Sequence, residues 1–201
     1  SVTVLSNNSN GGGATGSGQY AYGSIDTLRA TPYTNYIFQQ WNDGNSENPR
    51  YITVTNDTMF TAQFALRTYM VVLSSNNNAW GTVSGGGTYN YGQTVLCVAI
   101  PISGYHFVQW SIGNTNNPYI ITADSNISLT AQFAPDQYTV TVTSNDTTKG
   151  TVSGGGTYDY NQQIYIIAVP KPSYSFSQWS DGNTDAFRQL TVTQNVSYTA
   201  V

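Results

Sequence analysis

The stretch Gly-Thr-Val-Ser-Gly-Gly-Gly-Thr-Tyr occurs at residues 81–89 and again at residues 150–158. A drifted copy, Gly-Gly-Ala-Thr-Gly-Ser-Gly-Gln-Tyr, occupies residues 12–20. The copies start 69 residues apart, and other residue types keep the same interval: Trp41, Trp110 and Trp179; Pro32, Pro101 and Pro170; Phe38, Phe107 and Phe176. Self-similarity at a fixed period is typical of repeat proteins. The sequence therefore predicts three tandem modules, at residues 1–66, 67–135 and 136–201.

Within a module the apolar residues follow a period of two. Residues 138–143 (Tyr-Thr-Val-Thr-Val-Thr) alternate apolar and polar side chains, as a half-buried strand does. Turn residues and Pro170 separate this segment from further short apolar stretches. Strands are predicted at residues 138–143, 151–153, about 164–169, 174–179, 190–192 and 197–201. The predicted fold class is all-β, with about six short strands per module and no substantial helix.

The composition excludes several classes of protein. Only 8% of the 201 residues are charged and the net charge is -4, which excludes a nucleic-acid partner. The longest apolar run, residues 95–102, has eight residues and contains Pro101, whereas a membrane-spanning helix needs about 20. With 39% hydrophobic and 13% aromatic residues, the chain has enough apolar side chains to form cores.

The joint motifs resemble the divergent internalin B-type repeat, also called the bacterial repeat domain. The motifs are Tyr-x-Val-x-Val, the glycine-rich stretch, Ala-x-Pro, Tyr-x-Phe-x-x-Trp-x-x-Gly-Asn-Thr and Thr-Ala-Gln-Phe. The match is best at residues 69–133 and 138–200 and weaker at residues 2–64. The resemblance implies β-grasp-like or sandwich-like modules of bacterial cell-surface or secreted proteins, acting as spacers or adhesive stalks without catalytic residues. Ile112 replaces the aspartate of the other repeats, and Phe187 replaces a proline. The turn after Trp110 and the loop after Asp181 therefore depart from the family pattern.

The aromatic residues leave two interpretations open. The tryptophan at position 41 and its repeats are expected in the core, since a large aromatic ring buries about 150–250 Å². Phe38 and Trp41 are an odd number of residues apart, so a regular strand would place them on opposite faces. Either a bulge turns Trp41 inward or its ring is exposed. Trp80 has no counterpart in the other modules and is expected at the surface.

Few residues are candidates for a catalytic or metal-binding role. Cys97 lies in an apolar run and is interpreted as a buried, inert thiol, and His106 as a surface residue. No catalytic residue and no cofactor is predicted. Alternating oxygen ligands at Asp181, Asn183 and Asp185 give a calcium candidate, although turn chemistry explains the same residues.

Several sites fit glycosylation patterns. Asn-x-Ser/Thr triplets and Asp-Thr pairs give the candidates Asn56, Asn126, Asn195, Thr27, Thr58 and Thr147. The alternative is that these asparagines simply form turns.

The strand before each repeated proline predicts an interface. One face of this strand is apolar in every module and is expected in the core: Leu28 and Ala30, Cys97 and Ala99, Ile166 and Ala168. The opposite face is polar in the first module but apolar in the others, at Leu96, Val98 and Ile100 and at Tyr165, Ile167 and Val169. Such strips mark contacts with other chains or with neighbouring modules.

The repeats at the two ends are incomplete. The first module lacks the opening tyrosine of the other two, and the last lacks the phenylalanine found at positions 64 and 133. We therefore expect either a longer array or terminal strands that a neighbour completes through strand addition.

These features predict a non-catalytic, extracellular structural repeat array of the bacterial cell surface. It would be a stalk, an adhesin or a fibre-forming protein, and its partners would be other copies of itself or neighbouring repeats. The alternatives are an adhesive module that binds host or surface glycans through exposed Tyr and Trp, and a virion fibre or decoration protein. Exposed aromatic residues aligned on one face would favour glycan binding, and buried ones a stalk.

Overall fold

The computed structural model describes residues 1–201, which form β-strands and no helix, as the periodicity predicted. The residues group into two compact units. Unit 1 comprises Ser1–Val72, Gly85–Leu96 and Ile120–Ser128, and unit 2 comprises Leu73–Ser84, Cys97–Tyr119 and Leu129–Val201. The second repeat contributes to both units. The predicted module boundaries after residues 66 and 135 stay a prediction.

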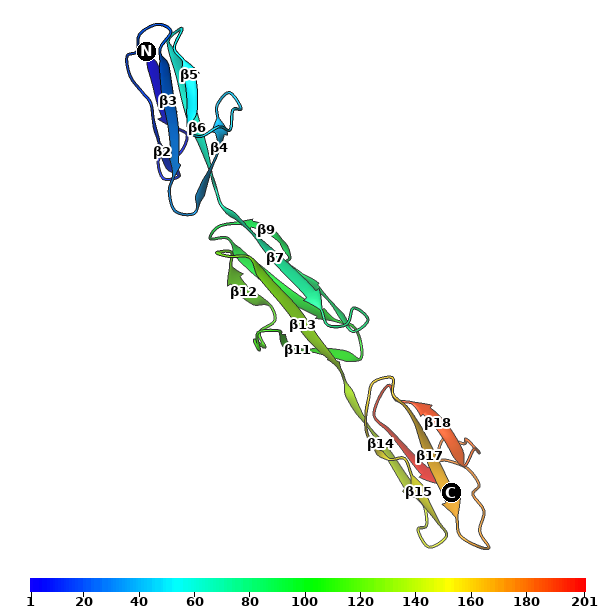
Figure 1. The fold of residues 1–201 in the computed structure, drawn as a ribbon. Helices are drawn as coiled ribbons and strands as arrows, with labels where there is room; N and C mark the ends of the chain where they lie inside the picture. The colour runs from blue at the N-terminus through cyan, green and yellow to red at the C-terminus, as the bar shows by residue number, and fades with distance from the viewer. The chain divides into compact units, whose positions relative to one another are not determined.

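The first repeat lies within unit 1 and consists of two three-stranded sheets (Figure 1). Its strands are β1 (Val2–Ser6), β2 (Gly12–Thr15), β3 (Ile25–Pro32), β4 (Tyr36–Trp41), β5 (Arg50–Thr53) and β6 (Thr58–Leu66). The sheet orders are β1-β6-β4 and β2-β3-β5. β1 runs parallel to β6, with Val2 opposite Thr58 and Ser6 opposite Ala62, whereas β4 is antiparallel to β6.

The third repeat lies within unit 2 and uses almost the same plan. Its strands are β14 (Gln137–Ser144), β15 (Gly150–Ser153), β16 (Gly156–Asp159), β17 (Gln163–Pro170), β18 (Phe187–Thr191) and β19 (Val196–Ala200). The sheet orders are β16-β14-β19 and β15-β17-β18. β14 is parallel to β19, from Val140 opposite Val196 to Ser144 opposite Ala200.

The second repeat has seven strands. They are β7 (Thr68–Ser75), β8 (Gly81–Ser84), β9 (Gly87–Asn90), β10 (Thr94–Pro101), β11 (Tyr105–Trp110), β12 (Tyr119–Thr122) and β13 (Ile127–Pro135). They form the sheets β11-β13-β7-β9 and β12-β10-β8.

The predicted core face of the strand before the proline is buried. Leu28, Cys97 and Ile166 are fully buried, and the alanines two residues later, at positions 30, 99 and 168, are also buried. In the first repeat Leu28 and Ala30 pack with Val2, Val4, Phe60 and Phe64 around Trp41.

A β-bulge resolves the position of the repeated tryptophan. The register of β4 against β6 shifts between Phe38 and Gln40, and β11 shifts against β13 at the equivalent place. The extra residue turns Trp41 inward, where none of its surface is exposed and its ring meets Phe38 edge-on at a centroid distance of 5.4 Å. Trp110 and Trp179 are equally buried.

One predicted strand does not form. Residues 174–178 are not a strand, and Trp179 makes only an isolated bridge to Ala200. In the first repeat, residues Tyr36–Phe38 of β4 pair with Phe64–Leu66 of β6. In the third repeat β19 ends at Ala200, so residues 174–176 have no strand beside them.

Candidate functional site

The turn after each repeated tryptophan holds the predicted calcium ligands. Asn183 donates its backbone N–H to Asp181 Oδ1 (3.3 Å), Asp185 donates to Asn183 Oδ1 (2.9 Å), and Arg188 binds Asp181 Oδ2 at 2.7 Å. Both carboxylate oxygens of Asp181 and the carboxamide oxygen of Asn183 therefore already have protein partners. No group of three or more His, Cys, Asp or Glu side chains in the chain is arranged to hold a metal ion.

The turn does not depend on its aspartate. Trp110 donates its backbone N–H to Asn114 O (2.8 Å) and Gly113 donates to Trp110 O (2.8 Å), the same bonds that form around Trp41 and Trp179. Ile112 is compatible with this turn because the turn is held by its backbone. The loop after Asp181 does differ between the repeats. Ala186 O accepts the N–H of Ala168, whereas side-chain oxygens of Asn48 and Asn117 accept the equivalent N–H groups.

An ion pair makes the stability of the first repeat sensitive to acid. Arg50 binds both carboxylate oxygens of Asp43, at 2.8 and 2.6 Å, and this hydrogen bonding lowers the pKa of Asp43. A lowered pKa in the folded state adds stability above the unfolded value of about 4, which is lost as the pH falls through the folded value. We expect Arg50→Gln to reduce the difference in unfolding free energy between pH 7 and pH 2.5 by about 0.2–1 kcal/mol, since Asp43 is partly exposed.

Denaturant titrations at the two pH values measure this difference. Arg29→Gln is the matched control, because Arg29 is exposed and forms no ion pair in the structure. An equal pH dependence in the wild type and in the Arg50 variant would contradict the prediction.

The glycosylation candidates lie mostly at the surface. Asn56, Asn126, Asn195, Thr58 and Thr147 are exposed, and Thr27 is half-buried. Asn126 Oδ1 accepts the backbone N–H of Met70, and Asn195 Oδ1 accepts that of Thr139, each at 2.8 Å. Two of the three asparagines therefore also fix the start of a neighbouring strand.

Neither Cys97 nor His106 belongs to a cluster of residues that could catalyse a reaction. Cys97 is fully buried, and burial raises the pKa of its thiol. His106 is exposed, and its Nδ1 lies 2.8 Å from Asp136 Oδ1.

The predicted interface residues are at least partly exposed. Leu96, Ile100, Tyr165 and Val169 are exposed, and Val98 and Ile167 are half-buried. In the third repeat the strip widens, because Phe187 of β18 stacks on Tyr165 of β17 at a centroid distance of 4.6 Å.

Trp80 is only partly at the surface, although it is more exposed than the repeated tryptophans. Trp80 is half-buried and stacks on Tyr105, with ring centroids 5.5 Å apart and 16° between the planes. Its partner is the aromatic residue that opens β11 in the same repeat, which the spacing of the sequence motifs does not indicate.

A phenylalanine of the central strand occupies a slot in the first two repeats. Phe64 of β6 meets Phe38 edge-on at 6.0 Å, and its ring covers Gly12 so closely that a Cβ on Gly12 would lie 2.5 Å from Phe64 Cε1. Phe133 covers Gly81 in the same way, at 2.5 Å. The glycine of the repeated motif is thus the floor of an aromatic slot.

An asparagine fixes the backbone of the same phenylalanine. Phe64 donates its N–H to Asn7 Oδ1 (2.9 Å), and Asn7 Nδ2 donates to Phe64 O (3.4 Å). Asn76 brackets Phe133 with the same pair of bonds, both of 3.0 Å. One carboxamide therefore holds both backbone groups of the residue whose ring fills the slot.

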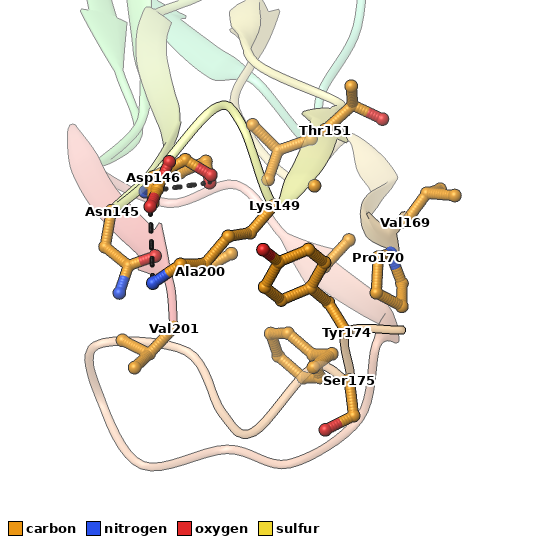
Figure 2. A pocket seen from close by; sticks show the side chains of 15 residues that line it. Asn145, Asp146, Lys149, Thr151, Val169, Pro170, Tyr174, Ser175, Ala200 and Val201 are labelled. Carbon is orange, nitrogen blue, oxygen red and sulfur yellow. Dashed lines mark hydrogen bonds and ion pairs between the residues drawn. The ribbon is translucent and has the colours of Figure 1, made fainter. Parts of the chain in front are cut away.

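A pocket of the third repeat lies at the equivalent place. It has a volume of 250 Å³, smaller than the roughly 300–1,000 Å³ of sites for drug-sized ligands, and is closer to a slot for one side chain. Its lining includes Gly150, Val152, Ala168 and Phe176. Figure 2 shows Asn145 and Val201 on one side of the opening and Tyr174 and Pro170 on the other.

The backbone of Asn145, which lines this pocket, is held as in the first two repeats. Asn145 is the equivalent of Asn7 and Asn76; it is exposed and is held through its backbone N–H, which donates to Ala200 O at 2.9 Å. At the rim Lys149 Nζ lies 3.2 Å from Asp146 Oδ2. The hydrogen bond from Thr148 and, after it, Lys149 lower the pKa of Asp146, so the rim carries two opposite charges.

The repeat pattern has a counterpart among known families. A family model described as the divergent InlB B-repeat domain matches residues 2–68, 71–137 and 138–201. The chain belongs to this family. Its three divergent InlB B-repeats cover almost every residue, which confirms the resemblance drawn from the sequence motifs. No curated protein matches the sequence.

A solved structure has a similar fold. The chain described as "The Bacillus anthracis TIE protein" aligns with a TM-score of 0.55 at 10% sequence identity. The alignment covers 98% of this chain and 49% of that chain, so these repeats span about half its length. At this identity the similarity concerns the fold. No helix of the divergent InlB B-repeats is long and apolar enough to cross a membrane.

Proposed function

We propose that the chain is a non-catalytic structural array of the bacterial cell surface, in which the divergent InlB B-repeats form a stalk that carries mechanical load. The observation behind this proposal is the pairing of the first and last strands within a repeat. β1 and β6 are neighbours and run parallel, and β14 and β19 repeat the arrangement.

This pairing determines how a repeat responds to a pull on its ends. The chain enters at the start of the first strand and leaves at the end of the last one, which are opposite ends of two parallel neighbours. A pull along the chain therefore shears the strands, and the evenly spaced hydrogen bonds of a parallel ladder share the load. Loading from the same end would break these bonds one after another.

The side-chain chemistry also favours a structural role. Acidic residues of the turns pair with nearby bases, as Asp43 does with Arg50 and Asp181 with Arg188, and the turn carboxylates thereby serve local structure. The repeated tryptophans are buried, and their faces are not free to stack on sugars. Both features favour the stalk over a glycan-binding module.

Force spectroscopy on the third repeat tests the load-bearing role. Handles attached at Gln137→Cys and Val201→Cys load β14 and β19 in shear, whereas handles at Gln137→Cys and Gln194→Cys pull on the same end of both strands. Cys97 is buried and leaves the labelling specific. We expect a rupture force several times higher in the first geometry. Similar low forces in both geometries would overturn the proposal.

The intact chain gives a second readout of the same experiment. Each repeat should unfold in its own event, releasing roughly 20–25 nm for 69 residues at about 3.3–3.6 Å per extended residue. A single continuous extension without separate events would contradict a modular stalk.

A further inference from the structure

We propose that the outer face of the sheet β15-β17-β18 in the third repeat is a saccharide-binding platform. Its ligand is an uncharged oligosaccharide. The C–H surfaces of the sugar pack on exposed aromatic rings, and its hydroxyl groups hydrogen-bond to glutamine side chains. Holding a neutral glycan on this face is a binding activity that goes beyond load-bearing.

Two stacked aromatic rings form the apolar part of the platform. Tyr165 of β17 is 46% exposed and Phe187 of β18 is 61% exposed. Their ring centroids lie 4.6 Å apart with 26° between the planes. The two rings hold each other in place, so a ligand loses little binding energy to ordering them. Their exposed surfaces offer an apolar area with a polar phenol group at its edge, which suits the mixed surface of a sugar.

Two glutamines form the polar part. Gln189 lies directly opposite Tyr165 in the register of β17 and β18, and its Nε2 donates to Gln163 Oε1 at 3.0 Å. Both glutamines are exposed. A carboxamide has two N–H donors and two acceptor positions, so this bond leaves donors and acceptors on both side chains for a ligand. Sugar hydroxyl groups donate and accept hydrogen bonds and can use both.

The platform carries no charge. The strands β15, β17 and β18 contain one charged residue, Arg188. The alternation of β18 places Arg188 on the opposite face from Phe187, and there it binds Asp181 Oδ2 at 2.7 Å. A charged ligand would find no opposite charge on the strands of this face, so the platform favours a neutral one.

The mixture of side chains also distinguishes a sugar from a flat apolar partner. Tyr165 and Gln189 share one row of the sheet, and Ile167 and Phe187 share the next. A second copy of this chain packed on the face would bury the glutamine together with the rings, and a buried carboxamide without partners is unfavourable. A saccharide presents C–H surface and hydroxyl groups side by side and matches both.

Only the third repeat combines these residues. Phe187 occupies the position of Pro49 and Pro118 in the other repeats, and Gln189 that of Tyr51 and Ile120. The platform therefore accounts for the departure of Phe187 from the repeat pattern. The first repeat, with an exposed tyrosine on the equivalent sheet, provides a control within the same chain.

An NMR titration of the intact chain tests the platform. The probes are four neutral hexasaccharides: cellohexaose, chitohexaose, mannohexaose and maltohexaose. At least one should cause saturable shifts of the side-chain amide signals of Gln163 and Gln189, while the backbone amide of Tyr51 stays unmoved. The absence of saturable shifts with all four probes would overturn the proposal.

A second measurement ties binding to the aromatic pair. Phe187→Ala removes one of the two rings and should weaken binding of the sugar by about tenfold or more. Tyr51→Ala is the matched control, because Tyr51 is 66% exposed but lies in the first repeat; this variant should bind like the wild type. A thermal melt verifies that each variant is folded. Unchanged binding by folded Phe187→Ala, or equal weakening in both variants, would contradict the assignment.

Gln189→Leu separates a sugar from an apolar partner. Leucine is close to glutamine in size but forms no hydrogen bond, so binding of the sugar should fall about three- to tenfold. Unchanged or tighter binding would show an apolar site instead and overturn the proposal. Sedimentation velocity without sugar gives the remaining outcome: a dimer that Phe187→Ala abolishes would assign the face to a second copy of the chain. Because none of these measurements depends on force, the platform and the load-bearing role can fail separately.

Discussion

Trp41→Ala should lower the free energy of unfolding of the first repeat by about 3–5 kcal/mol, the cost of removing a large aromatic side chain from a core. The Trp41 ring is fully buried, and it lies between Phe38 and Phe60 at centroid distances of 5.4 and 6.5 Å. Its Nε1–H also donates to Glu47 O at 2.9 Å, so truncation removes one partner of that bond. Chemical denaturation followed by circular dichroism measures the loss.

Trp80→Ala is the control for this truncation. Trp80 is half-buried and stacks on a single aromatic neighbour, and an aromatic pair contributes about 0.5–1.5 kcal/mol beyond its buried area. We therefore expect a clearly smaller loss. Losses of equal size in the two variants would mean that the repeated tryptophan is not the centre of the core.

Most of the fold could be predicted because local patterns and the global fold agree. Period-two alternation placed the buried face of β3, β10 and β17 correctly, since a strand residue has only two faces to occupy. The odd spacing between Phe38 and Trp41 indicated a bulge as one of two alternatives. Choosing between them required the pairing register of β4, which depends on a strand far along the chain.

The aromatic slot could not be predicted because its parts are distant in sequence. Asn7, Gly12 and Phe64 meet only after β1, β2 and β6 are placed, and each residue alone reads as an ordinary turn, strand or core residue. The sequence did show a phenylalanine repeated at positions 64 and 133. It did not show which glycine lies under the phenylalanine ring or which asparagine binds the phenylalanine backbone.

The missing strand at residues 174–179 has a similar cause. Its own residues keep the pattern of β4 and β11, but a strand needs a hydrogen-bonded neighbour as well as a pattern. The turn after Trp110 is the opposite case. There the aspartate of the motif is absent, yet the turn forms because backbone bonds hold it. A side-chain pattern therefore predicts a strand or a turn only where side chains, and not backbone hydrogen bonds, determine whether it forms.

Gly12→Ala should lower the free energy of unfolding of the first repeat by about 1–3 kcal/mol, the usual cost of overpacking a core. The added Cβ would lie 2.5 Å from Phe64 Cε1 and 2.7 Å from Thr31 O, both well inside contact distance. The ring is held by Phe38 beside it, and its own backbone is held by Asn7, so it has little freedom to move away. Denaturant titration with circular dichroism measures the change.

Gly13→Ala, in the same strand, should change stability in the opposite direction. A Cβ on Gly13 would meet nothing closer than Tyr33 Oη at 3.4 Å, an ordinary contact. Replacing glycine by alanine at a compatible site stabilises a protein by about 0.4–1 kcal/mol, because it reduces the freedom of the unfolded chain. Equal losses at Gly12 and Gly13 would show that the strand rejects side chains in general, and the aromatic slot would then not be the reason for the glycine.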